Sequence, residues 1–136
     1  MNDSWQYYGV FLDENSRKNL IKFVRGYVDI PDDWKVYCDH MTIIYNDGSK
    51  SAYMWASALE NKVGRSAMLD VYEIGVSDRC IAVKVSGYKS NNRISHVTVA
   101  VAPGAKPVES NKITNWKPVR EGISILGKFG VVNKRH

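Results

Sequence analysis

Apolar residues alternate with polar ones, or form short runs of β-branched and aromatic side chains, along most of this chain. Both patterns are typical of β-strands, the first half-buried and the second buried on both faces. Gly75, Gly87 and Gly104, with the turn-forming segment NDGS at 46–49, separate the runs. The predicted strands are 6–12, 34–45, 71–78, 80–88, 94–101 and 122–132.

One segment has helical spacing instead. The apolar residues of segment 14–28 recur every three or four positions, Asp13 precedes them as an N-cap, and Pro31 follows their end. We therefore predict a helix over 14–28. Segment 51–62 fits either a helix or a strand, and a short helix or turn is expected near 109–116.

Together these elements predict an α+β fold with much antiparallel sheet and few helices. A length of 136 residues is enough for one domain with its own core, so we treat 1–136 as a single domain. No apolar run approaches the roughly 18 residues of a membrane span, and the start MNDSWQYYGV does not resemble a signal peptide. We expect a cytoplasmic protein with no membrane partner.

The formal net charge of +5 is unevenly distributed. Residues 1–48 carry a net charge of −3, and residues 49–136 carry a net charge of +8. A basic half favours an anionic ligand, but its lysines and arginines are scattered, so a solvated surface explains them equally well. The charge points weakly to a phosphate ligand, and no stable nucleic-acid partner is expected.

Histidine and threonine are scarce, with three of each in the chain. Two histidines are followed two positions later by a threonine, in CDHMTIIY at 38–45 and in ISHVTVAV at 94–101. Residues two apart in a strand point to the same face. His40 and Thr42 should therefore project together from one strand, and His96 and Thr98 from another, opposite apolar residues that face the core.

Two imidazoles and two hydroxyls suit the cleavage of a phosphodiester. That reaction needs a base for the attacking oxygen, an acid for the leaving oxygen and hydrogen-bond donors for the non-bridging oxygens. Histidine, with an unperturbed pKa of about 6.5, can take both proton-transfer roles without a metal or cofactor. We therefore predict His40, Thr42, His96 and Thr98 as catalytic residues.

Two other interpretations stay open for these residues. Either histidine alone would more often be a partly buried residue hydrogen-bonded through its ring. A metal site made by Cys38, His40 and His96 lacks a fourth ligand in a recognisable spacing. Neither Cys38 nor Cys80 belongs to a CxxC pair, and both are expected to be partly buried free thiols.

The paired motifs resemble those of the 2H (two-histidine) phosphoesterase superfamily. The segments YYGVFLDENSR, DVYEIGV and SHVTVAVAPGAKPVESNKI further resemble the bacteriophage anti-CBASS phosphodiesterases, small members of that superfamily. The resemblance implies a two-lobed α+β fold whose central cleft holds both His-x-Thr strands. It also implies a cyclic oligonucleotide of bacterial immune signalling as substrate, in the cytoplasm of a bacterial host.

The resemblance implies further substrate contacts. The family has an N-terminal tyrosine in its site, and Tyr8 is the best match, which would leave Tyr7 on the other face. Trp116 and Trp5 are candidates to stack on a nucleobase. The remaining candidates, with phosphate or a base edge as their ligand, are Lys106, Lys112 and Glu109.

The function predicted in this way is metal-independent hydrolysis of 3′,5′ linkages in cyclic di- and trinucleotides, as a viral counter-defence. One alternative is an RNA 2′,3′-cyclic phosphodiesterase or RNA-end-processing enzyme. Another is a non-catalytic protein that sequesters nucleotides. Which histidine is the base, which bases and ring sizes are preferred, and the oligomeric state are not readable from the sequence.

Overall fold

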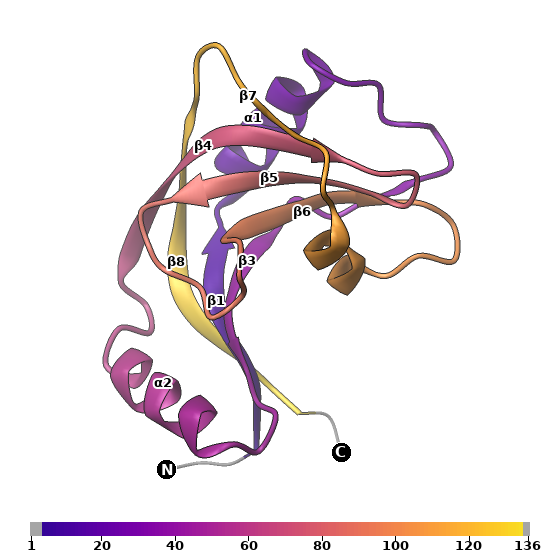
Figure 1. Cartoon of the computed structure of the whole chain (residues 1–136). Coiled ribbons are helices and arrows are strands. Elements are labelled where there is room, and N and C mark those ends of the chain that lie inside the picture. The colour runs from indigo at the N-terminus through magenta and orange to yellow at the C-terminus, as the bar shows by residue number, and fades with distance from the viewer. Residues whose placement is uncertain (1–3, 135–136) are drawn as a thin grey trace.

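In the computed structural model, which describes residues 4–134, eight strands form one antiparallel sheet in the order β2-β6-β5-β4-β8-β1-β3, with β7 paired to β4 (Figure 1). The α+β class with mainly antiparallel sheet is confirmed. The strands are β1 (Trp5–Leu12), β2 (Lys35–Val36), β3 (His40–Tyr45), β4 (Ser66–Val76), β5 (Cys80–Ser86), β6 (His96–Val101), β7 (Trp116–Pro118) and β8 (Ser124–Asn133). The helices are α1 (Glu14–Arg25), α2 (Lys50–Glu60) and the 3-10 helix η1 (Pro107–Lys112).

Helix α1 begins as the sequence predicts and ends earlier. The Asp13 carboxylate accepts a hydrogen bond from the backbone N–H of Ser16 at 2.7 Å, which caps the first turn. The predicted end at residue 28 is wrong, because the helix stops at Arg25 and the backbone N–H of Gly26 turns back to the carbonyls of Lys22 and Phe23. The ambiguous segment 51–62 lies almost entirely in α2, so it is a helix.

The single strand predicted over 34–45 is wrong, because two strands occupy this segment. Cys38 has a φ of 50°, in the left-handed region, and this residue breaks the extended backbone. Before the break, the backbone N–H groups of Tyr37 and Cys38 donate to carbonyls of β6. After it, β3 pairs with β1, so the chain passes here from one edge of the sheet to the other.

Strand β7 has no counterpart among the predicted strands. Its Trp116 pairs with Gly75 of β4 and lays its ring over that glycine. A Cβ at position 75 would lie 2.5 Å from the Trp116 ring, so the contact depends on glycine.

Buried side chains form two clusters. The larger lies between the sheet and helices α1 and α2, where Leu20, Val24 and Leu59 are buried against strand residues. The smaller includes Cys80 and Ile113 near η1. Both cysteines are free and fully buried, as free thiols in a core.

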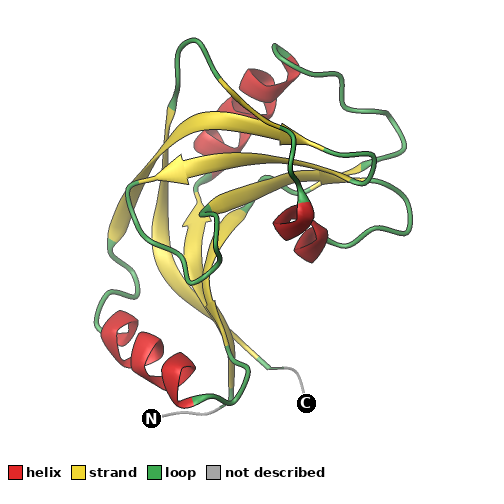
Figure 2. Ribbon diagram, in the orientation of Figure 1, coloured by secondary structure: helices red, strands yellow, loops and turns green. Residues whose placement is uncertain are grey.

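The sheet bends into two halves that share β4 (Figures 1 and 2). Residues 66–70 of β4 pair with β8, and residues 70–76 pair with β5. One half therefore continues through β8 and β1 to β3, and the other through β5 to β6 and β2. The two His-x-Thr strands lie near the two ends of this path. None of the helices within residues 4–134 has the length and apolar character needed to cross a bilayer.

Candidate active site

Strand β3 presents its histidine and threonine on one face. Met41 and Ile43 are buried in the core, whereas His40 and Thr42 are half-buried on the opposite side. Gly9 of β1 lies opposite Thr42, and a Cβ there would come within 2.5 Å of the Met41 carbonyl oxygen. Glycine at position 9 thus lets β3 lie close to β1 and sets the position of the first motif.

Strand β6 repeats the arrangement. Val97 and Val99 are fully buried in the core, and His96 and Thr98 lie on the other face. The alternation predicted from the sequence is therefore confirmed for both strands.

Hydrogen bonds bring the two motif strands together. The backbone N–H of Cys38, just before β3, donates to the Thr98 carbonyl of β6 at 3.0 Å. On the other side, the Ser90 hydroxyl donates to the Thr42 carbonyl at 2.7 Å, and Asn91 N–H donates to the Ile43 carbonyl at 2.7 Å. The loop before β6 is thereby attached to β3.

The four histidine and threonine side chains line one cleft of about 290 Å³. The cleft is large enough for a phosphate and part of a nucleoside. The other lining residues are Tyr7, Tyr45, Asn92, Pro107, Val108 and Asn111.

His40 lies between a carboxylate and a hydroxyl. Its Nδ1 is 2.7 Å from the Asp39 carboxylate, and its Nε2 is 3.1 Å from the Thr42 hydroxyl. The hydrogen bond to His40 is the main reason that the pKa of the Asp39 carboxyl is lowered. An ionised Asp39 can only accept, so Nδ1 of His40 carries a proton and Nε2 is left for the cleft side.

His96 has a different environment. It is 8% exposed, and its Nδ1 donates to the backbone carbonyl of Ile94 at 2.8 Å. Burial lowers the pKa of His96, the hydrogen bond to the Ile94 carbonyl offsets part of this effect, and the nearby His40 makes a smaller lowering contribution. Neutral His96 therefore has its lone pair on Nε2, the atom that a general base uses.

Thr98 is tied to helix η1. Its hydroxyl and that of Ser110, which is buried, are 2.9 Å apart. This hydrogen bond holds η1 over β6, where Pro107, Val108 and Asn111 of η1 form one wall of the cleft.

The prediction that Tyr8 lines the site is wrong, and Tyr7 lies there instead. Tyr8 is buried on the core face, with its ring centroid 5.3 Å from that of Trp5. Tyr7 lines the cleft and stacks on His40 at 5.1 Å between ring centroids. The alternation of β1 explains this, because Tyr8 points to the same face as the fully buried Val10.

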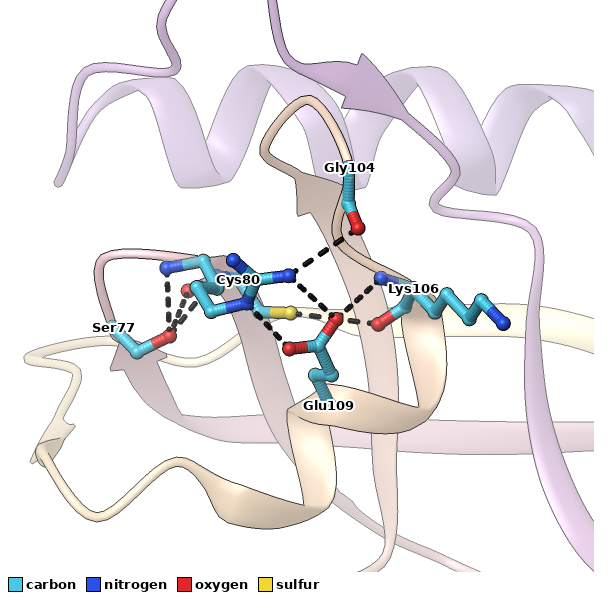
Figure 3. A network of polar contacts seen from close by, with 6 residues as sticks. Ser77, Cys80, Gly104, Lys106 and Glu109 are labelled. Atoms are coloured by element: carbon cyan, nitrogen blue, oxygen red, sulfur yellow. Dashed lines mark hydrogen bonds and ion pairs between the residues drawn. The ribbon is translucent and has the colours of Figure 1, made fainter.

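Lys106 and Glu109 adjoin the cleft residues Pro107 and Val108 in the chain but do not line the cleft. The Glu109 carboxylate accepts a hydrogen bond from the Lys106 backbone N–H at 2.7 Å and forms an ion pair with Arg79 (Figure 3). Both contacts lower the pKa of Glu109. Glu109 thus closes the first turn of η1, and the structure does not bring it or Lys106 to the four motif side chains.

The predicted tryptophans also lie elsewhere. Trp5 is 2% exposed and has no face free for a base. Trp116 packs on Gly75, donates its Nε1–H to the Ile113 carbonyl at 3.0 Å and has the Lys84 ammonium over its ring. Neither lines the cleft, so the prediction of stacking by Trp5 or Trp116 at this site is wrong.

A metal site that includes Cys38 does not fit the geometry. Its thiol is fully buried, and burial raises the pKa of Cys38 to about 12, whereas metal ligation needs a thiolate. Within residues 4–134, no three His, Cys, Asp or Glu side chains lie close enough together to hold a metal ion.

Sequence reasoning missed several residues in and beside the cleft. Asp39, which lies beside the cleft on Nδ1 of His40, directly precedes His40 in the sequence, and this is a visible signal for its role. Tyr45 could not be found by strict alternation, because Ile43 is an extra residue in the pairing of β3 with β1, and Tyr45 returns to the cleft face. Asn92 and Asn111 come from a loop and a 3-10 helix, where no periodicity applies.

The sequence matches no known family model and no curated protein. The fold is similar to that in a crystal structure of a fungal RNA kinase, with a TM-score of 0.68 and 14% sequence identity. The similarity covers 99% of this chain and 46% of that one, so this chain spans about half the length of the kinase. At this identity the likeness shows a shared fold, and a fold of this kind occurs in an RNA-modifying enzyme.

Proposed function

We propose that this protein is a metal-independent phosphodiesterase in which His40 and His96 form the acid–base pair. The observation that supports this most directly is that both histidines and both threonines of the motifs line one cleft, from two different strands. In-line displacement at phosphorus needs proton transfer on two opposite sides, which two imidazoles in one cleft can supply.

In the first step His96 is the base and His40 the acid. His96 takes the proton of a ribose 2′-hydroxyl, whose oxygen attacks the adjacent 3′-phosphorus. As the bond to the leaving 5′-oxygen breaks, the His40 imidazolium, compensated by Asp39, protonates that oxygen. The products are a 2′,3′-cyclic phosphate and a free 5′-hydroxyl, and water can open the cyclic phosphate with the two roles exchanged.

The threonines stabilise the charge that develops on phosphate. Thr42 lies beside His40 Nε2, and Thr98 is held by Ser110, so both hydroxyls have fixed positions at the cleft. Hydrogen-bond donors fixed before reaction stabilise a phosphorane-like charge without reorganisation.

Two substrate classes are proposed for this chemistry. Similarity in fold to a fungal RNA kinase favours an RNA end, which the alternative predicted from the sequence specifies as an end with a 2′,3′-cyclic phosphate. The resemblance of the quoted segments to anti-CBASS phosphodiesterases favours a cyclic oligonucleotide. Both contain the ribose and the phosphodiester that the histidine pair requires.

The test is incubation of the purified protein, in excess chelator, with a cyclic 3′,5′ dinucleotide, a cyclic trinucleotide and an RNA ending in a 2′,3′-cyclic phosphate. Products are separated by chromatography. Cleavage of any of the three supports the phosphodiesterase, and the ratio of kcat/KM values identifies the substrate class. His40→Ala and His96→Ala should each lower turnover by about 10²- to 10⁴-fold. The control is His136→Ala, which removes a histidine outside the two motifs.

Three intact substrates at high protein concentration would contradict the proposal. Recovery of intact, tightly bound nucleotide after denaturation would instead identify a protein that sequesters nucleotides.

A further inference from the structure

The cleft with the two histidines shares lining residues with two neighbouring hollows. On one side it shares Tyr45 with a neighbouring hollow of about 550 Å³. On the other side it shares Asn92 and Asn111 with a second hollow of about 490 Å³. Because the cleft shares lining residues with both hollows, the three spaces are neighbours, and we call them together the trough, with the histidine cleft as its middle section.

The first end of the trough is aromatic. Tyr45 is 54% exposed, and its ring is nearly parallel to that of Tyr7, at an interplanar angle of 10° and a centroid distance of 6.2 Å. Tyr7 stacks in turn on His40. The Gln6 amide donates to the Tyr45 hydroxyl at 2.9 Å, which restrains the exposed ring.

An exposed, restrained aromatic ring beside a phosphate site is a surface on which a nucleobase can stack. The space beyond Tyr45 is lined by Gln6, Asn133 and Lys134, among others. These side chains offer hydrogen bonds to a base edge and a positive charge, and their hollow is large enough for a nucleoside.

The second end of the trough is polar and cationic. Its lining includes Arg93 and Lys112, with the amides of Asn91, Asn92 and Asn111, and contains no acidic residue among those that the structure describes. Arginine and lysine beside amide groups are typical of sites that bind phosphate and sugar.

We propose that the substrate continues on both sides of the scissile phosphate, with a nucleobase stacked on Tyr45 at one end of the trough and a second phosphate bound by Arg93 and Lys112 at the other. This inference rests on the phosphodiesterase function. It assigns the chain to internal phosphodiesters of oligoribonucleotides, linear or cyclic, in preference to a terminal nucleoside 2′,3′-cyclic phosphate, which has no nucleotide on its 3′ side.

The experiment compares kcat/KM for a mononucleoside 2′,3′-cyclic phosphate, a linear trinucleotide and a cyclic trinucleotide. The kcat/KM of both trinucleotides should exceed that of the mononucleoside by at least about tenfold, because each end of the trough that the substrate occupies adds contacts. A large difference between the linear and the cyclic trinucleotide identifies which of the two sources fits the trough.

Variants locate the two ends. Tyr45→Leu should lower kcat/KM for the trinucleotides by about tenfold and kcat/KM for the mononucleoside by a smaller factor, whereas Tyr45→Phe keeps the ring and should retain activity. The control is Tyr72→Leu, an exposed tyrosine of β4 that lines none of the three spaces. The double variant Arg93→Gln/Lys112→Gln should also lower kcat/KM for the trinucleotides. Its control is Lys128→Gln on β8, which removes a positive charge outside the three spaces.

Equal kcat/KM for the mononucleoside and the trinucleotides would overturn the inference, as would a Tyr45→Leu variant that loses the same factor on all of them. The phosphodiesterase function would stand in both cases. The phosphodiesterase function can also fail while the two binding ends are real. Binding of a 2′-O-methyl trinucleotide, which lacks the attacking hydroxyl, tests this possibility. If this analogue binds in a Tyr45-dependent way and no ribose substrate is cleaved, the phosphodiesterase fails and the two binding ends remain.

Discussion

Strands β3 and β6 carry the same His-x-Thr motif in two different environments. His40 is partly open to solvent and has the Asp39 carboxylate at 2.7 Å. His96 is buried, and its ring donates to a neutral backbone carbonyl. A carboxylate compensates a positive charge, whereas burial disfavours one, so two motifs that are alike in sequence are suited to opposite proton-transfer roles.

The difference arises next to each motif. Asp39 precedes His40, and Ser95 precedes His96. Thr42 is bonded to its own histidine, while Thr98 is bonded to Ser110 of η1. In the first motif, His40 contacts both the Asp39 carboxylate and the Thr42 hydroxyl. In the second motif, Thr98 is part of the packing between β6 and η1.

The largest expected effect comes from a test that separates acid from base. His40→Ala should lower cleavage of a normal 5′-oxygen ester by about 10²- to 10⁴-fold. With a 5′-thiolate leaving group, which needs no proton, the same variant should recover to within about tenfold of the wild-type chain, whereas His96→Ala should not recover. Single-turnover rates measure this, and the opposite pattern would exchange the two roles.

A smaller effect is expected from Asp39→Asn. The amide keeps the size of the carboxylate and loses the charge that compensates an imidazolium, so kcat should fall by about tenfold. KM should change little, because Asp39 does not line the cleft. Asp47→Asn, on an exposed turn, is the matched control, and equal kcat values for both variants would remove Asp39 from the mechanism.

The pH dependence follows from the lowered pKa of His96. Protonated His96 cannot act as a base, so kcat/KM should fall on the acid side with an apparent pKa below the usual 6.5. Activity should thus persist at pH 6 to a degree that an unperturbed histidine would not allow. A pH–rate profile of the first step checks this, and an acid limb above pH 6.5 would contradict the assignment of His96 as base.

The smallest effect concerns stability. Ser110→Ala removes the buried hydrogen bond to Thr98 and should lower the free energy of unfolding by about 1 kcal/mol. Thr42→Ala, on the half-buried β3 motif, should lower it less, because the partner of the Thr42 hydroxyl within residues 4–134 is the partly solvated His40 ring. Urea unfolding of both variants measures the difference, and equal losses would remove the contrast between the two strands.

Much of the fold and the faces of the two motif strands could be predicted from the sequence because they depend on period-two alternation. The faces of β3 and β6 are set by the buried residues Met41, Ile43, Val97 and Val99, which sequence alone identifies as apolar. The N-cap at Asp13 was likewise visible, because capping is a local interaction.

The errors lie where long-range contacts override local patterns. A left-handed residue at Cys38 splits one apolar run into β2 and β3, and no local signal marks it. Trp116 is an aromatic residue of the kind that stacks on nucleobases, but its ring packs on the backbone of Gly75 instead. Tyr7 and Tyr8 are adjacent and chemically equal, so only the register of β1 decides which of them reaches the cleft.

Strand β4 also determines when in folding this site can exist. The path along the sheet from β3 to β6 passes through β4, whose pairing with β8 joins residues far apart in the sequence, whereas its pairing with β5 is a hairpin. A chain that has formed only one half of the sheet therefore has only one of the two motif histidines in its native position, and the cleft does not yet exist. Activity should be an all-or-none property of the folded molecule, lost on heating at the same temperature as the β-sheet itself.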